Sequence, residues 1–134
     1  MASNELTPED RELINSRNRA HLATVNPDGS PQVSPVWVDV EGDLIRVNSA
    51  RGRVKVRNVE RDPRVGVAVT ADDDPLRRVL VQGDVVNVTE EGARDHIDEL
   101  ARRYDGTDGY LGMTPGMVRV IIEIRPRRVT RAGG

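Results

Sequence analysis

The segment from residue 47 to residue 58 combines the residue types that hold a phosphate group. It leaves a predicted strand, turns at residues 49–52 and opens a predicted helix. The N-terminus of a helix offers unpaired backbone N–H groups and positive potential, which suit an anion. The segment adds four basic residues and two hydrogen-bond donors: Arg51, Arg53, Lys55 and Arg57, with Ser49 and Asn58. We therefore predict a phosphate site here, and a solvated basic helix face is the alternative interpretation.

Lys55 stands out among these basic residues. The chain has 20 lysines and arginines, and Lys55 is its only lysine. In so arginine-rich a background, a lysine that persists is informative, although a solvated surface lysine remains the other interpretation. The Gly-x-x-x-x-Gly-Lys-Ser/Thr pattern of a P-loop is absent, so the site is not predicted to be a nucleotide triphosphate loop.

The remaining side chains offer little chemistry of their own. The chain has no cysteine, which excludes disulfides, thiolate catalysis and cysteine-ligated metal. We expect His96 to be exposed to solvent and His21 to be packed, and the two lack the spacing of metal ligands. The acidic run at residues 72–74 lacks the spacing of an EF-hand and is interpreted as a solvated loop. No metal is predicted, and any reaction is expected to depend on a bound cofactor.

A second wall of a pocket is predicted at residues 26–37. Gln32 and Ser34 share one face of a strand and can meet the polar edge of a ring. Pro35 cannot donate to a strand ladder, so it marks a bulge or an edge strand and frees neighbouring backbone groups. Trp37 is expected to lie in the core rather than against a ligand.

Strands and helices must bring these residues together. Turn signals at residues 26–29 and 41–43, with apolar alternation between turns, predict six strands. We place the strands at residues 20–25, 32–40, 44–49, 64–70, 77–88 and 117–129, and the helices at residues 8–17, at 50–61, and from a cap at 89 to about 104. Hairpin connections indicate an antiparallel sheet that closes on itself.

Two further local features follow from single residues of this pattern. Gly83 interrupts the long fifth strand and is expected to mark a β-bulge. The chain end from Arg131 to Gly134 is expected to be frayed, because nothing in the sequence fixes it.

The composition bounds the class of protein. A chain of 134 residues suits one domain over residues 1–134, and a net charge of -2 argues against a dedicated nucleic-acid binder. No stretch approaches the roughly 20 apolar residues of a membrane span, and the polar N-terminus is unlike a signal peptide, so we expect a cytoplasmic protein without membrane partners.

With no Phe, one Trp and two Tyr, the core must be thin. A homodimer is therefore predicted, because a second copy would bury more apolar surface.

Three stretches of the chain resemble the pyridoxamine-phosphate-oxidase-like split-barrel superfamily. They are residues 22–37, the run Gly-Arg-Val-Lys-Val-Arg-Asn at 52–58, and the run Arg-Asp-Pro-Arg-Val at 61–65. The resemblance covers about residues 8–129. Within the superfamily, the sequence is most similar to the branch of deazaflavin (coenzyme F-420) dependent reductases. It implies a mainly β fold: a six-stranded antiparallel split barrel with flanking helices. It also implies a homodimer with two cofactor sites at the subunit interface.

The resemblance further implies which residues hold the cofactor. The segment that leaves the third strand would grip its phosphate, and the second strand would form a wall against its isoalloxazine-like ring. Two residues beyond the fourth strand would contact it from the other side. The predicted cofactor-binding residues are Gln32, Ser34, Pro35, Val36, Asn48, Ser49, Arg53, Lys55, Asn58, Ala71 and Arg78.

The activity that this resemblance implies is hydride transfer from reduced coenzyme F-420 to a small electron-poor organic acceptor. The arginines around Lys55 favour F-420, whose phosphate is followed by an acidic oligoglutamate tail. Two alternatives stay open: an FMN-dependent oxidase or reductase, and a protein that binds F-420 or flavin without turnover. No side chain is predicted to be an essential acid or base.

Overall fold

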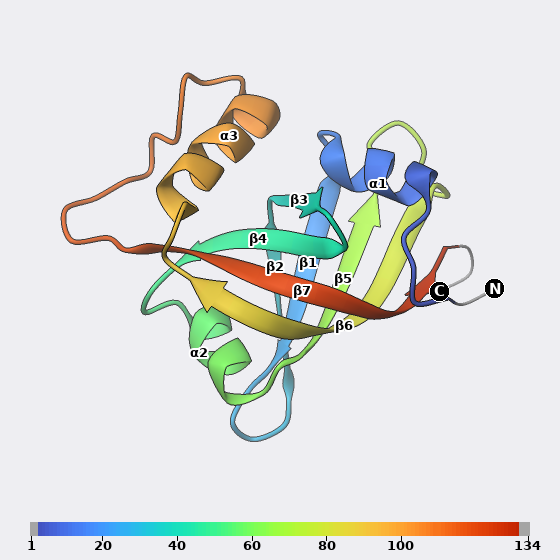
Figure 1. Cartoon of the computed structure of the whole chain (residues 1–134), viewed down its shortest axis with the longest axis horizontal. Coiled ribbons are helices and arrows are strands. Elements are labelled where there is room, and N and C mark those ends of the chain that lie inside the picture. The colour runs from blue at the N-terminus through green and yellow to red at the C-terminus, as the bar shows by residue number, and fades with distance from the viewer. Residues whose placement is uncertain (1–2, 132–134) are drawn as a thin grey trace.

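Short apolar runs between turn sequences form the strands of this protein, whose computed structural model describes residues 3–131. The strands are β1 (Arg19–Val25), β2 (Pro31–Val36), β3 (Val38–Glu41), β4 (Leu44–Ala50), β5 (Arg64–Thr70), β6 (Arg78–Thr89) and β7 (Arg119–Thr130). The helices are α1 (Pro8–Asn15), α2 (Val54–Arg61) and α3 (Ala93–Asp105). In Figure 1, α1 and α3 lie above the sheet and α2 lies below it.

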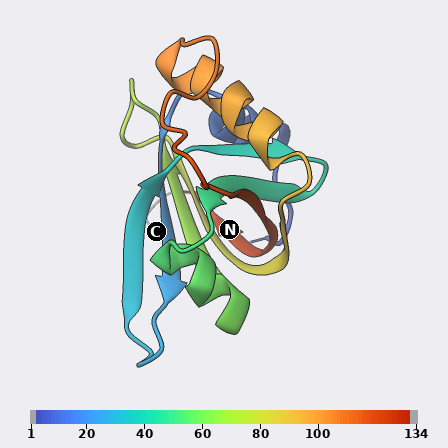
Figure 2. The same cartoon turned by 90° about the vertical axis from the view of Figure 1, so that its left-hand side faces the viewer.

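All strands join one antiparallel sheet in the order β2-β1-β5-β6-β7-β4-β3. The strand predicted at residues 32–40 is in fact two strands, because the chain bends at Trp37. β2 then pairs with β1 and β3 pairs with β4, at opposite edges of the sheet. Since one residue links the two edges, the sheet must curl into a half-barrel, as Figure 2 shows. The predicted mainly β split barrel is confirmed, with seven strands in place of six.

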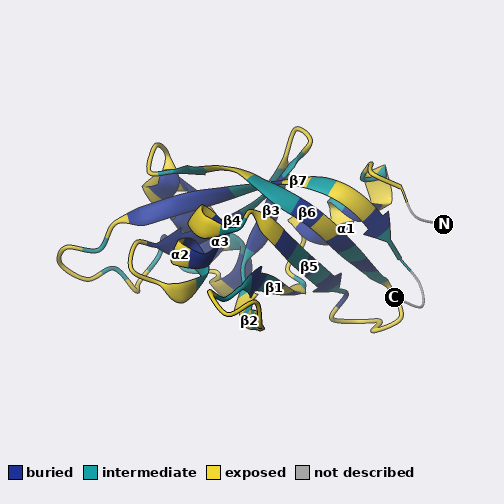
Figure 3. Cartoon of the chain, turned by 90° about the horizontal axis from the view of Figure 1, so that it is seen from below, coloured by how far each residue is buried: buried dark blue, intermediate teal, exposed yellow. Residues whose placement is uncertain are grey.

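The barrel interior is aliphatic, as expected of a chain with no Phe, one Trp and two Tyr. Residues that alternate along each strand point inward and are almost fully buried, which gives the strands in Figure 3 their banded colouring. Examples from five strands are Leu22, Ile45, Val69, Val79 and Ile122. A smaller cluster on the buried face of α3 holds Ile97, Leu100 and Tyr104, and the partly buried Trp37 and Tyr110 pack against it. The expectation that Trp37 lies in the core is therefore wrong: its ring is half-buried at the margin of this smaller cluster.

An ion pair ties the start of α1 to the residue that follows the last strand. Thr7 and Asp10 form a capping box that satisfies free N–H groups at the start of α1. The Arg131 guanidinium donates two hydrogen bonds to the Asp10 carboxylate, at 2.9 and 2.5 Å. The prediction of a frayed end is thus wrong for Arg131, because this ion pair fixes it. The rest of that prediction, residues 132–134, lies outside the described residues.

The bulge predicted at Gly83 is confirmed by a register shift between Gln82 and Gly83 where β6 crosses β7. A Cβ atom at Gly83 would lie 2.7 Å from the carbonyl oxygen of Arg125, so the two backbones approach too closely for any side chain. A bulge bends its strand and increases the local twist, which favours the curl of the sheet.

The second and third helices start later than predicted. Residues 49 and 50 remain in β4 because they pair with β7, so α2 begins only at Val54. α3 begins at Ala93, because Gly92 takes the left-handed conformation (φ 73°) at its cap. In residues 3–131 the longest helix, α3, has 13 residues, fewer than a membrane-crossing helix requires.

Candidate functional site

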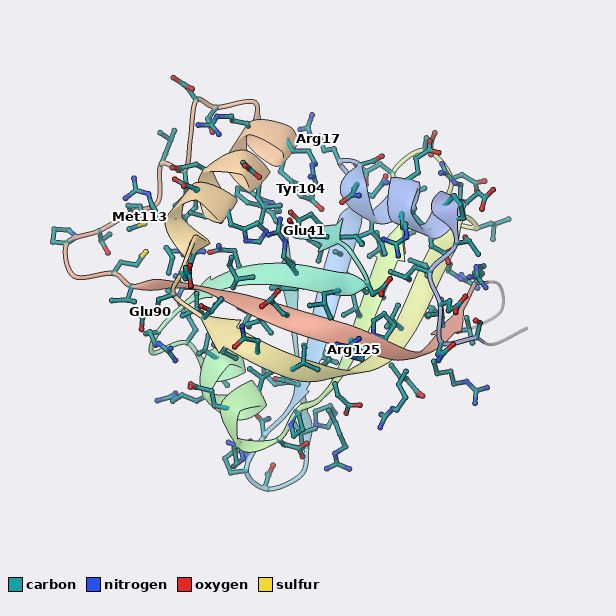
Figure 4. All side chains as sticks on the ribbon, in the orientation of Figure 1. Arg17, Glu41, Glu90, Tyr104, Met113 and Arg125 are labelled. Carbon is teal, nitrogen blue, oxygen red and sulfur yellow. The ribbon has the colours of Figure 1, made fainter. Side chains whose placement is uncertain are left out.

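A cavity of about 710 Å³ opens between the β1–β2 edge, the junction of β4 with α2, and α3. This volume lies within the range of roughly 300–1,000 Å³ that is typical of small-molecule sites. Its lining comes from all parts of the chain: Arg17, Asn18, Arg19, Ala20, His21, Pro35, Val36, Trp37, Asn48, Ser49, Arg53, Lys55, Asp72, Ile97, Tyr104, Tyr110 and Arg119. Figure 4 labels two of these side chains, Arg17 and Tyr104, between α1 and α3.

The wall formed by the β4–α2 junction and β7 carries three cations. Arg53 is the N-cap residue of α2, and its side chain makes no capping hydrogen bond. Lys55 lies in the first turn of that helix and is half-buried, and Arg119 on β7 is 8% exposed. Within residues 3–131, no carboxylate lies within ion-pair distance of any of the three. A bound anion would therefore relieve an uncompensated positive charge in this wall.

The electrostatics of Lys55 reflect this crowding. Burial lowers the pKa of the Lys55 ammonium, and the nearby charges of Arg53 and Arg119 lower it further. The first N–H groups of a helix also have no intrahelical partner, so the start of α2 adds positive potential to the same wall. Both effects favour an anion with several oxygens, such as a phosphate, over a neutral ligand.

Aromatic rings form the next part of the lining. Trp37 stacks on Tyr104 with ring centroids 5.3 Å apart and planes within 8° of parallel. Tyr110 meets Trp37 edge-on at 6.3 Å, and its backbone N–H donates to the Asp98 carboxylate at 2.8 Å. This stacked and anchored group gives the cavity a flat, rigid side suited to a ring system.

The edge strand β2 supplies the wall beside these rings. β2 pairs only with β1, so its backbone groups on the other side have no partner in the sheet. Pro35 lies opposite His21 in that pairing, and its missing N–H has no consequence at an edge, as the sequence predicted. Backbone groups next to Pro35 and Val36 are therefore free to bond the polar edge of a ligand.

The structure brings together six of the eleven predicted cofactor-binding residues, which all line the cavity: Pro35, Val36, Asn48, Ser49, Arg53 and Lys55. The other five lie outside its lining: Gln32, Ser34, Asn58, Ala71 and Arg78. Asn58 is 2% exposed and donates hydrogen bonds to Thr24 and Asn26, which ties α2 to β1. Gln32 accepts from the Thr24 hydroxyl, and Ala71 is buried in the main core. Contact with a cofactor stays a prediction for all eleven residues.

Both expectations about the histidines are wrong. His96 is 3% exposed, because β3, β4 and the body of α3 enclose it, whereas His21 is exposed and lines the cavity. Strand alternation places His21 on the outward face of β1, which the pattern of Ala20 and Leu22 could have indicated.

Sequence reasoning also missed Arg119, Tyr110 and the two arginines at the far end of the cavity, Arg17 and Arg19. Alternation along β7 assigns Arg119 to the face opposite Val120. It does not reveal that α3 covers that second face and turns an exposed position into the wall of a cavity.

A curled antiparallel half-barrel with a cation-lined, aromatic-walled cavity at its edge defines the class of this protein as a split-barrel domain. Within that class the chain belongs to the pyridoxamine 5'-phosphate oxidase family, whose model matches residues 6–131. Proteins of this fold bind flavin-type cofactors, and many of them are oxidoreductases.

Solved structures agree with this assignment. An F-420 reductase is 34% identical, with a TM-score of 0.78, over 90% of this chain and 94% of its own. The conserved hypothetical protein Rv2991 from Mycobacterium tuberculosis is 26% identical, with a TM-score of 0.73, over 97% of this chain and 87% of its own. A pyridoxamine 5'-phosphate oxidase-type protein from Listeria innocua, 20% identical with a TM-score of 0.71 over 96% of this chain and 100% of its own, shares the fold.

Proposed function

We propose that this protein is a reductase that uses reduced coenzyme F-420 to reduce a small electron-poor organic compound. The observation that carries the proposal is the cation cluster of Arg53, Lys55 and Arg119, which lines the cavity without a carboxylate partner in the described part of the chain. The F-420 reductase that is 34% identical to this chain supports F-420 as the cofactor over FMN.

The residues present fit such a cofactor. The cation cluster and the start of α2 would hold its phosphate, since charged hydrogen bonds to Arg and Lys are the strongest available to that group. The ring would lie along the β2 edge, with the rings of Trp37, Tyr104 and Tyr110 on the neighbouring side. When bound, reduced F-420 supplies a hydride to the acceptor. The chain's own contribution is to bind, to orient the two partners and to exclude water from between them.

No side chain is assigned as an essential proton donor. The exposed His21 lines the cavity and is open to solvent, so a proton can reach the product from water without a dedicated acid. Arg17 and Arg19 are exposed and line the same cavity. The charge of Arg19 is partly compensated, because its Nε lies 3.6 Å from Asp72 Oδ1.

A homodimer is part of this proposal. The outer face of the sheet carries a second hollow of about 460 Å³, whose lining includes His21, Ala23, Val33, Gly66, Ala68, Leu80 and Gln82, with Arg128 and Thr130 from β7. Three of its lining residues are small, namely Ala23, Gly66 and Ala68, and Val33 in the same lining is 61% exposed. His21 lines both this hollow and the cofactor cavity. A second copy seated on the outer face would therefore cover apolar surface and complete the wall of the cofactor cavity.

Fluorescence titration of the purified protein with F-420 and, separately, with FMN tests the cofactor assignment. We expect tighter binding of F-420, and oxidation of reduced F-420 in the presence of a panel of enones, imines and quinones. Tighter binding of FMN, with turnover of reduced FMN alone, would identify the protein as an FMN-dependent enzyme. Tight F-420 binding with no turnover of any acceptor would support a binding protein without catalysis.

A further inference from the structure

Four polar side chains from four different elements meet in the interior next to the cavity. Asp39 on β3, Asn48 on β4, His96 on α3 and Arg119 on β7 are 4%, 9%, 3% and 8% exposed. Polar groups this deeply buried are costly unless they are paired. Their contacts form a continuous series, which starts at the ion pair of Asp39 with Arg46 and ends at Arg119 in the cavity wall.

Arg119 determines which atoms of Asn48 and His96 donate and which accept in this series of contacts. A guanidinium can only donate, so its Nε, 2.9 Å from Asn48 Oδ1, assigns that atom as the amide oxygen. The amide nitrogen of Asn48 must then face the Ala93 carbonyl at 2.8 Å and His96 Nδ1 at 3.0 Å. His96 Nδ1 therefore accepts, and the imidazole proton resides on Nε2, on the side of Asp39.

Asp39 is the anchor at the far end of the series. Arg46 donates to both of its carboxylate oxygens, at 2.9 and 2.7 Å. Burial opposes ionisation of this carboxyl, but its contacts with His96 and Arg46 outweigh burial and lower its pKa. His96 Nε2 lies 3.2 Å from Asp39 Oδ2 in a charge–dipole contact that is not a well-aligned hydrogen bond. The negative charge on Asp39 thus holds the imidazole in one orientation.

Arg119, at the other end, has only neutral partners in the described residues. Besides Asn48, its guanidinium lies over the Tyr110 ring at 4.9 Å from the centroid, and its Nη1 is 3.7 Å from the Met117 sulfur. A buried arginine usually has an anionic partner, because its desolvation is expensive. Arg119 instead lines the cavity without an anionic partner among the described residues. Asn48, Tyr110 and Met117, all neutral, hold its side chain in place.

We propose that Asp39, His96 and Asn48 are positioning residues that hold the Arg119 guanidinium in the cavity wall, where Arg119 binds the phosphate of the bound cofactor. This inference rests on the proposed function. It assigns a phosphate ligand on β7, far in sequence from the segment at residues 47–58, and it gives the buried histidine of α3 a structural task in binding.

Binding of matched cofactor pairs, with and without phosphate, measures this role directly. FMN is compared with riboflavin, and F-420 with the deazaflavin that lacks both the phosphate and the glutamate tail, by fluorescence titration. The affinity ratio within the FMN pair reports phosphate recognition alone, whereas the ratio within the F-420 pair reports recognition of the phosphate and the tail together. Arg119→Met should lower both ratios about 10-fold or more, the effect of losing a hydrogen bond to a charged group. Asn48→Leu should lower both ratios about threefold or more, because Arg119 loses its orientation.

A double-mutant cycle separates positioning from general destabilisation. If Asn48 acts through Arg119, then Asn48→Leu in the Arg119→Met background should leave the ratios unchanged. Asn87→Leu is the matched control, since Asn87 is an exposed amide on β6 that bonds Glu123 outside the cavity. Arg119→Met should fold in any case, because it replaces a buried unpaired charge with an apolar chain.

Each alternative result overturns a different statement. Additive losses in the double variant would show that Asn48 does not act through Arg119. A fall in the F-420 ratio without a fall in the FMN ratio would place Arg119 at the glutamate tail and overturn the phosphate assignment. Unchanged ratios in Arg119→Met would overturn the inference while leaving the proposed function in place. Equal affinity of the parent protein for both members of each pair would overturn both the inference and the proposed function.

Discussion

Lys55 connects the cation cluster most directly to the proposed phosphate. It is half-buried at the start of α2 and has no carboxylate partner in the described residues. A hydrogen bond to a charged group contributes roughly 1.5–3 kcal/mol, so Lys55→Ala should weaken F-420 binding by about 10- to 150-fold. The free energy of unfolding should change by less than about 0.5 kcal/mol, because the ammonium makes no hydrogen bond or ion pair with any residue from 3 to 131. Fluorescence titration at low salt and urea denaturation measure the two effects.

The matched control for this substitution is Arg57→Ala. Arg57 is exposed on the same helix, two residues further on, and does not line the cavity. Its loss should leave the affinity unchanged. Equal affinities of Lys55→Ala and the parent protein would return the basic segment to a solvated helix face. Arg131, whose side chain bonds Asp10, would be an unsuitable control because its loss perturbs the fold.

The pH dependence of binding should report the same lysine. Burial, Arg53 and Arg119 lower the pKa of Lys55 in the free protein, and a bound phosphate should raise it again by stabilising the ammonium. Affinity is therefore full below the free-protein pKa and falls as pH rises through it. The affinity of the Lys55→Arg variant should stay constant up to about pH 10, since arginine stays charged. Titrations between about pH 7 and pH 10 compare the two, and parallel profiles would contradict the assignment.

At the scale of elements, the ion pair of Asp10 with Arg131 joins the start of α1 to the end of the last strand. Burial opposes ionisation of Asp10, but hydrogen bonds from Arg131 and Thr7 outweigh it, so the pKa of Asp10 is lowered. A carboxyl with a lowered folded-state pKa stabilises the fold above its unfolded value, and this stability is lost as pH falls through the folded value.

Asp10→Asn should therefore lower the unfolding free energy by about 1–3 kcal/mol at neutral pH. The difference from the parent protein should shrink on going to about pH 2, because Asp10 takes up a proton as pH falls through its lowered pKa and then resembles asparagine in charge. Urea denaturation at the two pH values measures it. Asp43→Asn is the control, because Asp43 makes only an exposed ion pair with Arg11. A deficit of equal size at both pH values would show that charge is not the cause.

At the scale of the whole molecule, the proposed dimer should form through the outer face of the sheet. The variant Val33→Glu with Ala68→Glu places two charges per copy on this face and should give a monomer at micromolar concentration, measured by light scattering. Leu76→Glu should remain dimeric, because Leu76 is 79% exposed in the loop between β5 and β6, outside this face. A parent protein that is a stable folded monomer would contradict the dimer and the shared cofactor site.

Much of the local structure was predictable because it depends on neighbouring residues. Alternation and turn chemistry placed β5 at its observed bounds and the bulge at Gly83. The strand–turn–helix segment that carries Ser49, Arg53 and Lys55 was also recognisable, because basic residues at a helix start have a local electrostatic meaning.

The sequence by itself determined the class of fold, the family resemblance and one wall of the cavity, because periodicity, turn residues and helix starts are encoded over a few consecutive positions. Tertiary structure decided the rest. The bend at Trp37 sends one predicted strand to both edges of the sheet, and α3 then covers β7, burying His96 and turning Arg119 into a cavity wall. These outcomes depend on pairings between residues 50 or more positions apart, such as His96 with Asp39 and Arg119 with Asn48, and local patterns carry no information about such distant partners.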